Sequence, residues 1–107
     1  MENGIKTDQK LFPFYLVKCG GAVHKHYVSA DLTASQKVNL FQELIDGTYD
    51  TVISERAVAL VDDEGLLKEK SINLPMSMYL NVAINGDVIV FAKEVFEAFD
   101  KSMEEED

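Results

Sequence analysis

The chain has 107 residues, with 10 lysines and arginines against 19 aspartates and glutamates, and its formal net charge is −9 at pH 7. This length suits one domain and is too short for two ordinary ones. The strong acidity argues against binding nucleic acid or an anionic membrane surface through bulk charge.

Two strands are predicted first. Leu11–Lys18 is rich in aromatic and β-branched residues, which are typical of a strand. Pro13 cannot donate to a ladder, so this strand is expected at a sheet edge or is expected to start at Phe14. Val23–Ser29 predicts a second strand. The Gly20-Gly21 pair between them favours a hairpin with a primed turn, because glycine accepts positive φ without steric cost.

A helix is predicted over about residues 34–46. Thr33 is its expected cap, with Gln36 completing a capping box, and Asp31 is the alternative cap. Gly47 stands where a glycine commonly ends a helix. The apolar side chains at helical spacing are Val38, Phe41, Leu44 and Ile45, widened by Leu40. The side chains expected on the wetter side are Lys37, Asn39, Gln42, Glu43 and Asp46.

Short β-like runs follow at Tyr49–Ser54 and Arg56–Val61. The second run is apolar enough to predict a central strand covered on both faces. Asp62–Gly65 predicts a turn, with acceptor side chains first and glycine last. Leu66–Lys70 is expected to return as a strand and to make a second hairpin.

The last third contains a short helix, a strand and a second long helix. Pro75 biases Leu74 away from helix, so the helix is expected within Met76–Ala83. A turn at Asn85-Gly86 precedes a buried strand over Asp87–Phe91. An apolar stripe then predicts a C-terminal helix over about residues 93–103.

These elements predict an α+β domain: a small, mainly antiparallel sheet of two hairpins plus a closing strand, packed against the two helices. The domain is expected over residues 10–103, between a flexible N-terminus of residues 1–9 and an acidic tail of residues 104–107. A single core is expected to hold Phe14, Leu16, Phe41, Leu44, Ile45, Val58, Leu60, Val88, Val90, Val95 and Phe99.

The order of these segments is similar to a known domain. Asp46–Tyr49 follows the first long helix, Val58–Lys68 surrounds the acidic turn, Leu74-Pro75 comes next, and Ile84–Phe91 closes the sheet. Over about residues 14–92 this resembles DUF3846, a family of small uncharacterised domains from phages and other mobile elements. The resemblance implies an accessory protein acting in the cytoplasm of a host cell, and it implies no catalytic residue.

Candidate chemistry is sparse. His24 and His26 fall on one strand face near Cys19, which suggests either a zinc site or a thiol nucleophile with its base. The competing interpretation is an edge strand whose solvent face carries histidines, because no fourth ligand or catalytic signature accompanies them. Three adjacent carboxylates at Asp62–Glu64 suit a solvated turn better than a calcium loop. We therefore expect no enzyme, no cofactor, and no catalytic, cofactor-binding or metal residue.

The acidity is unevenly distributed. Residues 1–61 contain seven acidic and six basic side chains, whereas residues 62–107 contain twelve and four. A block of one charge sign steers an oppositely charged partner, so a basic protein surface is the expected partner. The methionine and tyrosine side chains after Pro75 can adapt to irregular partners, so they suggest either an exposed docking patch or residues that close the bottom of the core. The residues predicted to bind a partner are Asp62, Asp63, Glu64, Met76, Met78, Tyr79, Glu104, Glu105, Glu106 and Asp107.

The predicted function is a small acidic protein-binding module of the cytoplasm, since the N-terminus lacks the apolar segment of a signal peptide. Its sharpest version is a DNA-mimic inhibitor of a host enzyme; direct nucleic-acid and membrane binding are not expected. The first alternative is a homodimer or larger scaffold joined through strand 14–18 or helix 95–103. The second alternative is a binder of a small nucleotide-like ligand.

Overall fold

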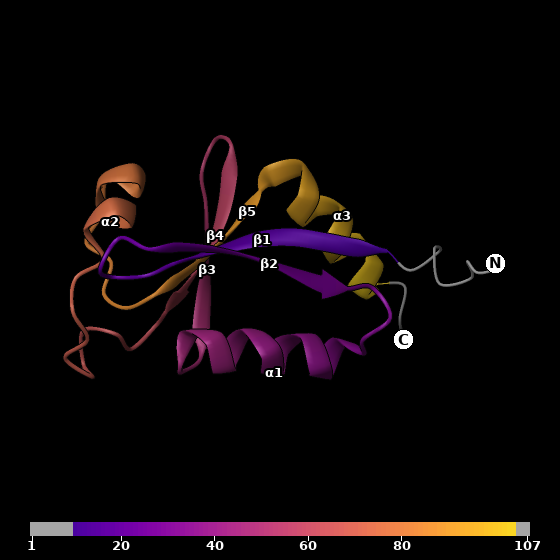
Figure 1. Ribbon diagram of the computed structural model, residues 1–107, viewed down its shortest axis with the longest axis horizontal. Coiled ribbons are helices and arrows are strands. Elements are labelled where there is room, and N and C mark those ends of the chain that lie inside the picture. Colours follow the sequence, from indigo (N-terminus) through magenta and orange to yellow (C-terminus); the bar gives the residue numbers. More distant parts are fainter. Residues whose placement is uncertain (1–9, 105–107) are drawn as a thin grey trace.

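A five-stranded antiparallel sheet forms the centre of the molecule, in the order β2-β1-β5-β4-β3 (Figure 1). The computed structural model describes residues 10–104. In chain order the elements are β1 (Leu11–Val17), β2 (Val23–Ser29), α1 (Ala34–Ile45), β3 (Tyr49–Ile53), β4 (Ala57–Asp62), α2 (Leu74–Leu80), β5 (Val88–Ala92) and α3 (Lys93–Glu104). The α+β class is confirmed.

The middle strand of the sheet is β5, which joins two hairpins. It pairs with β1 over Tyr15–Val17 and with β4 over Ala57–Leu60, both antiparallel. The first hairpin is β1–β2 as predicted. The second is β3–β4, whose two strands pair from Tyr49↔Asp62 to Ile53↔Val58. All six residues of β4 are buried, which confirms the expected central strand.

Both long helices form where the sequence predicts them. The Thr33 hydroxyl accepts the Gln36 N–H (3.1 Å), and the Gln36 side chain accepts the Thr33 N–H (2.9 Å), so the capping box is confirmed. At the other end of α1, Asp46 takes the left-handed conformation (φ 65°) and precedes Gly47. The chain can therefore turn sharply from α1 into β3.

Two apolar clusters lie on opposite faces of the sheet, so the expectation of a single core is wrong. Strand side chains alternate between the faces, and every strand of the sheet's centre therefore feeds both clusters. Leu16 and Val17, or Val88 and Ile89, are neighbours in sequence and belong to different clusters. α1 and α3 cover the first cluster, and α2 covers the second.

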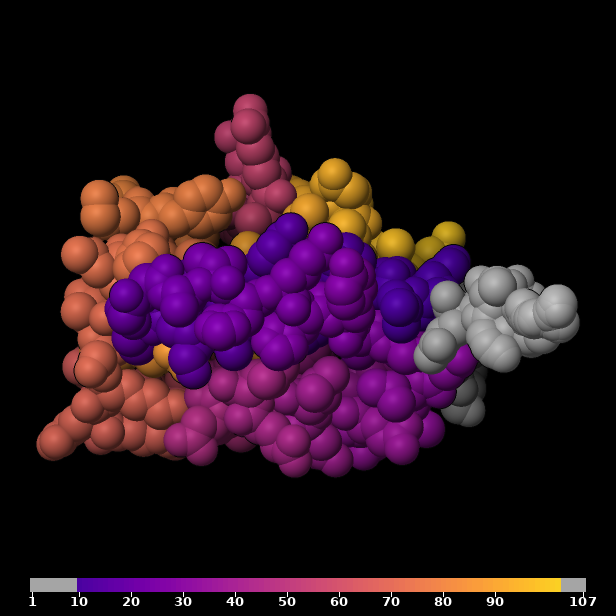
Figure 2. Space-filling model, in the orientation of Figure 1, coloured from indigo at the N-terminus to yellow at the C-terminus, as the bar shows by residue number. Residues whose placement is uncertain are grey.

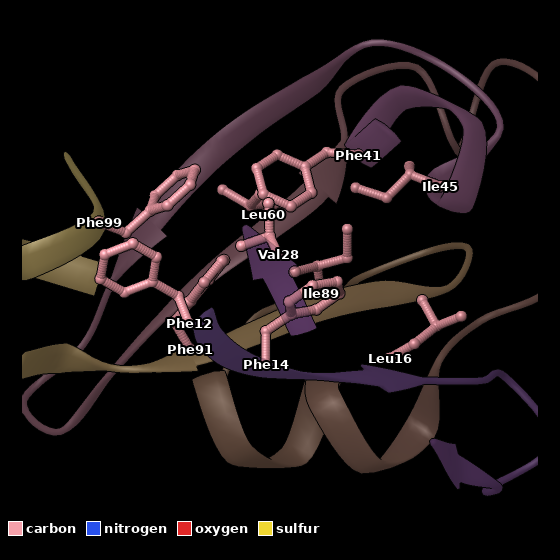
Figure 3. Packing of buried hydrophobic residues seen from close by; sticks show 10 residues of the cluster. All are labelled: Phe12, Phe14, Leu16, Val28, Phe41, Ile45, Leu60, Ile89, Phe91 and Phe99. Carbon is pink, nitrogen blue, oxygen red and sulfur yellow. The ribbon is translucent and has the colours of Figure 1, made fainter. Parts of the chain in front are cut away.

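The first cluster is dominated by aromatic rings (Figure 3). Phe41 of α1 makes edge contacts with Phe14 and Phe91 at centroid distances of 5.6 and 5.9 Å, and Phe99 of α3 stacks on Phe91 at 5.4 Å. Its buried members are Phe12, Phe14, Leu16, Val28, Phe41, Ile45, Leu60, Ile89, Phe91 and Phe99. The second cluster consists of Val17, Ala59, Val61, Met76, Ile84 and Val88.

β1 is neither an edge strand nor a strand that starts at Phe14, contrary to the two alternatives predicted from Pro13, because it begins at Leu11. It lies between β2 and β5. The ladder with β5 covers only Tyr15–Val17, so Pro13 lies beyond the ladder, where β1 pairs with β2 alone. A missing N–H is tolerated at that position.

The β1–β2 turn is not primed. The Gly21 N–H donates to the Lys18 carbonyl (2.9 Å), which makes Cys19 and Gly20 the central residues of the turn. Neither has the positive φ that a primed turn requires; only Gly21 does, at 100°. This is the three-residue loop in which a left-handed glycine follows an ordinary turn.

Three further expectations are wrong. Leu66–Lys70 is a series of turns instead of a strand, because its hydrogen bonds are local, such as Lys68 N–H to the Glu64 carbonyl (2.9 Å). Lys37 is fully buried instead of solvated, and its Nζ lies 5.4 Å from the centre of the Phe99 ring. The helix placed within Met76–Ala83 instead starts at Leu74, with Pro75 in its first turn, where a proline needs no N–H partner.

Candidate functional site

Six of the residues predicted to contact a partner, those of Asp62–Glu64 and Met76, Met78 and Tyr79, lie at one end of the molecule, formed by residues 62–87, whereas Glu104 ends α3 away from it (Figure 1). This end contains the loop after β4, helix α2 and the approach to β5, coloured salmon to orange at the left of Figures 1 and 2. Its side chains divide into an internal polar cluster that fixes the loop and an exposed apolar set.

Asp62 belongs to the internal cluster. It is the last residue of β4, and its side chain has no solvent exposure. One carboxylate oxygen pairs with the ammonium groups of Lys70 and Lys68, and the other accepts the Glu64 N–H (2.8 Å). Asp62 is therefore a structural anchor, and its prediction as a contact for a basic partner is wrong.

The Asp62 carboxylate stays ionised in this enclosed position. Burial alone would raise the pKa of this carboxyl, but the hydrogen bonds from Lys70, the Glu64 N–H and Lys68 outweigh burial and lower it. Two cations and a backbone donor thus compensate one buried charge.

The same lysines also complete the C-terminal end of α1. Lys70 Nζ donates to the carbonyls of Ile45 (2.8 Å) and Asp46 (2.9 Å), and Lys68 Nζ donates to that of Asp46 (3.2 Å). α1 has no basic residue in its own last turn, so the loop supplies the positive charge that a helix C-terminus favours. A side chain at Gly47 would collide with Lys68 Nζ and the Asp62 carboxylate.

Asn73 fixes the far end of the loop. It is fully buried, and its amide donates to the carbonyls of Val17 (2.9 Å) and Gly86 (3.0 Å) while its oxygen accepts the Met76 N–H (3.2 Å). It thereby caps α2 and joins that helix to β1 and to the turn before β5. The position of α2 on the sheet follows from this one side chain and from Met76, which is buried in the second cluster.

The three residues predicted to form a docking patch after Pro75 differ in solvent exposure. Met76 is only 5% exposed, so its prediction as a docking residue is wrong and the alternative, the floor of a core, is correct for it. Met78 and Tyr79 are 73% and 55% exposed. With their neighbours they make up what we call the 66–82 surface, whose exposed large apolar side chains are Leu66, Leu67, Ile72, Leu74, Met78, Tyr79 and Val82.

Acidic side chains border the 66–82 surface. Asp63, Glu64 and Glu69 are exposed on the loop, and Asp63 also accepts the Thr48 hydroxyl (2.7 Å). Lys70 is directed to Asp62 and to the end of α1, whereas Lys68 makes the same contacts and stays partly exposed beside these acids. The backbone of α3 ends at Glu104, and Glu105, Glu106 and Asp107 lie outside the described residues.

The other candidate groups do not converge. Cys19 donates its thiol to the Ser71 carbonyl (3.3 Å), and burial raises the pKa of the thiol, which opposes nucleophilic chemistry. His26 stacks on Phe14 with ring centroids 5.4 Å apart. Within residues 10–104, no three histidine, cysteine or acidic side chains come together in a way that suits a metal ion.

The hollows of the surface are open and mixed in charge. One of about 380 Å³ adjoins the β3–β4 turn. A hollow of about 250 Å³ adjoins Cys19, Lys70 and Asp87. The residues lining the hollow at the β3–β4 turn are Glu55, Arg56, Ala92, Lys93, Glu94 and Glu97. Three carboxylates and no aromatic ring line this hollow, so it is unsuited to a nucleotide.

No family model, curated protein or solved structure matches this chain. The similarity to DUF3846 therefore stays a prediction and assigns no role to any residue. None of the helices within residues 10–104 has both the length and the apolar character that a membrane-spanning helix needs.

Proposed function

We propose that this protein is a protein-binding module that contacts its partner through the 66–82 surface. The supporting observation is the concentration of exposed apolar side chains. Seven of the twelve exposed large hydrophobic residues in the described part of the chain fall between Leu66 and Val82. Scattered exposed apolar residues need no explanation, but a concentration at one end of a small domain is typical of an interaction site.

The partner that fits this surface is a protein with an apolar patch bordered by basic side chains. Asp63, Glu64 and Glu69 supply the acidic border, and the chain's net charge of −9 adds a long-range attraction for cations. Together with the resemblance to DUF3846, this supports an accessory protein of a phage or mobile element that binds a host protein. A DNA-mimic surface would have one acidic side chain fewer than predicted, because Asp62 is paired with Lys68 and Lys70.

Affinity purification with matched variants tests the proposal. The double variant Leu67→Ser/Met78→Ser removes two exposed side chains of the 66–82 surface, whereas Ile53→Ser removes an exposed side chain from β3. Wild type and Ile53→Ser are expected to retain the same partner from native cells, and the double variant is expected to lose it at unchanged melting temperature. Retention is also expected to fall above about 0.3 M salt, where surface charges are screened. Equal retention by the double variant contradicts the proposal.

Self-association through the same surface is the second candidate. The two routes suggested by the sequence are used internally, since β1 lies inside the sheet and Phe99 of α3 is buried in the first cluster. Sedimentation at micromolar concentrations separates the candidates. If the wild type is a dimer and Leu67→Ser/Met78→Ser is a monomer, the homo-oligomer is favoured. If the wild type is a monomer, the homo-oligomer is excluded.

A further inference from the structure

A second surface, on the β1–β2 hairpin, has the opposite charge. Residues 10–29 contain three lysines, two histidines and no aspartate or glutamate, and one of the lysines, Lys18, is paired with Asp87 (2.9 Å). Since the whole chain carries −9, the remaining residues carry −12. The hairpin is exposed along the viewed face in Figure 2, coloured indigo to purple. A basic strand pair within a strongly acidic protein calls for a function of its own.

The outer edge of β2 is open to another strand. β2 pairs with β1 at all seven positions, from Leu11↔Ser29 to Val17↔Val23, with no bulge. Within residues 10–104 no other strand pairs with it. Natural edge strands are protected by proline, bulges, shortness or charge, and β2 has only the charge of Lys25. The opposite edge, β3, is shorter and carries Asp50.

Basic groups flank that open edge on both faces. On one face Lys25 is exposed, with its Nζ 5.3 Å from the Tyr27 ring centre and 6.0 Å from that of Tyr15. On the other face His24 is exposed and His26 is half-buried against Phe14. A strand placed beside β2 would meet an ammonium group on one face and imidazoles on the other.

We propose that the outer edge of β2 binds an extended acidic segment of a partner protein, which adds to the sheet as a sixth strand. Main-chain hydrogen bonds would supply affinity, and carboxylates on the face of Lys25 would supply selectivity. This surface is distinct from the 66–82 surface, so the two proposals stand or fall separately.

The observations favour an acidic polypeptide over two other occupants. A single-stranded nucleic acid needs aromatic faces for its bases, but the Lys25 ammonium lies over both tyrosine rings. A second copy paired through β2 would bring together two hairpins that have lysines and histidines and no acid. Only an acidic strand satisfies both the open peptide groups and the charge.

Binding of a synthetic peptide tests this inference. The probe is a seven-residue peptide of alternating Glu and Thr, titrated into the ¹⁵N-labelled full chain. We expect the amide signals of β2 to shift on binding, with a Kd below about 1 mM. Tight binding is not expected, because a short flexible peptide loses conformational entropy when it is ordered as a strand. A version N-methylated at alternate residues keeps every charge but cannot complete the ladder, and it is expected to bind at least about tenfold more weakly.

Two protein variants complete the test. Lys25→Glu is expected to weaken binding by about tenfold or more, whereas Lys101→Glu, the same charge change on exposed α3, is expected to change it less than about twofold. The inference is overturned if β2 amides do not shift, or if N-methylation or Lys25→Glu has no effect. It is also overturned if a ten-nucleotide thymidine strand binds more tightly than the peptide, or if β2 mediates a dimer that excludes the peptide.

Discussion

Replacement of Asp62 by asparagine is the most direct test of the internal polar cluster. The substitution keeps the shape of the side chain and an oxygen for the Glu64 N–H, and it removes only the negative charge. It leaves the ammonium groups of Lys70 and Lys68, whose side chains are 18% and 36% exposed, without their carboxylate. We expect the variant to fold and to be less stable at neutral pH.

The size of the loss follows from the burial of the three groups. Removing one partner of a fully buried ion pair costs about 3–5 kcal/mol, and an exposed pair is worth about 0–1 kcal/mol. Lys70 is mostly enclosed but keeps the carbonyls of Ile45 and Asp46, and Lys68 can reach water. We therefore expect a loss of about 2 kcal/mol, or about 10 °C in melting temperature for a domain of this size.

The loss should depend on pH in a defined direction. The pKa of Asp62 is lower in the folded protein than in the unfolded chain, where it is about 3.9. The unfolded chain therefore binds the proton first, and the stabilisation is complete above about pH 5 and disappears as the pH falls through the folded pKa. Urea unfolding of both proteins should give a constant difference between pH 6 and 8 and a shrinking one below about pH 4.

The matched control is Glu64→Gln, which removes the same charge from an exposed side chain two residues away. It is expected to change the free energy of unfolding by less than about 0.5 kcal/mol. If Asp62→Asn is as stable as Glu64→Gln, or if its deficit is undiminished at pH 3, the assignment of Asp62 as an ionised anchor is refuted.

Three further substitutions and reactions have defined outcomes. Asn73→Ala leaves two carbonyls and one N–H without partners and should cost about 3 kcal/mol by urea unfolding, whereas exposed Asn39→Ala should cost almost nothing. Thr33→Ala removes the acceptor for the Gln36 N–H and should cost about 1 kcal/mol in the same assay. Cys19 should react with iodoacetamide more slowly at pH 7.5 than in the urea-unfolded chain, because burial raises its thiol pKa; equal rates would contradict this.

Elements specified by neighbouring residues could be predicted from the sequence. α1 follows from a 3.6-residue period and from a cap three residues away from its partner, and β5 follows from a short apolar run after Asn85-Gly86. These signals come from residues close together in the sequence, so they do not depend on how the rest of the chain packs. The order of the strands is not local: that β5 separates β1 from β4 depends on packing between residues more than 70 positions apart.

The role of single charged residues was the hardest to predict. Asp62 and Asp63 are adjacent acids in one turn, yet one is enclosed by Lys70 and the other faces solvent. Only the path of the intervening loop distinguishes them. For Lys37 a signal was present: it precedes Phe41 and Ile45 at intervals of four residues, so helical geometry places all three on the buried face. The charge of its side chain, considered without this spacing, predicts the solvent-facing side instead.

The central place of β5 also constrains the order in which the molecule can assemble. A ribosome releases β1 to β4 first, and at that stage the chain has two separate hairpins with no strand between them. Hairpins of this kind are marginally stable alone, and β1 and β4 each expose the edge that β5 later fills. Folding of the sheet therefore waits for residues 88–92 to emerge, and until then the nascent chain depends on whatever shields those two edges from other chains.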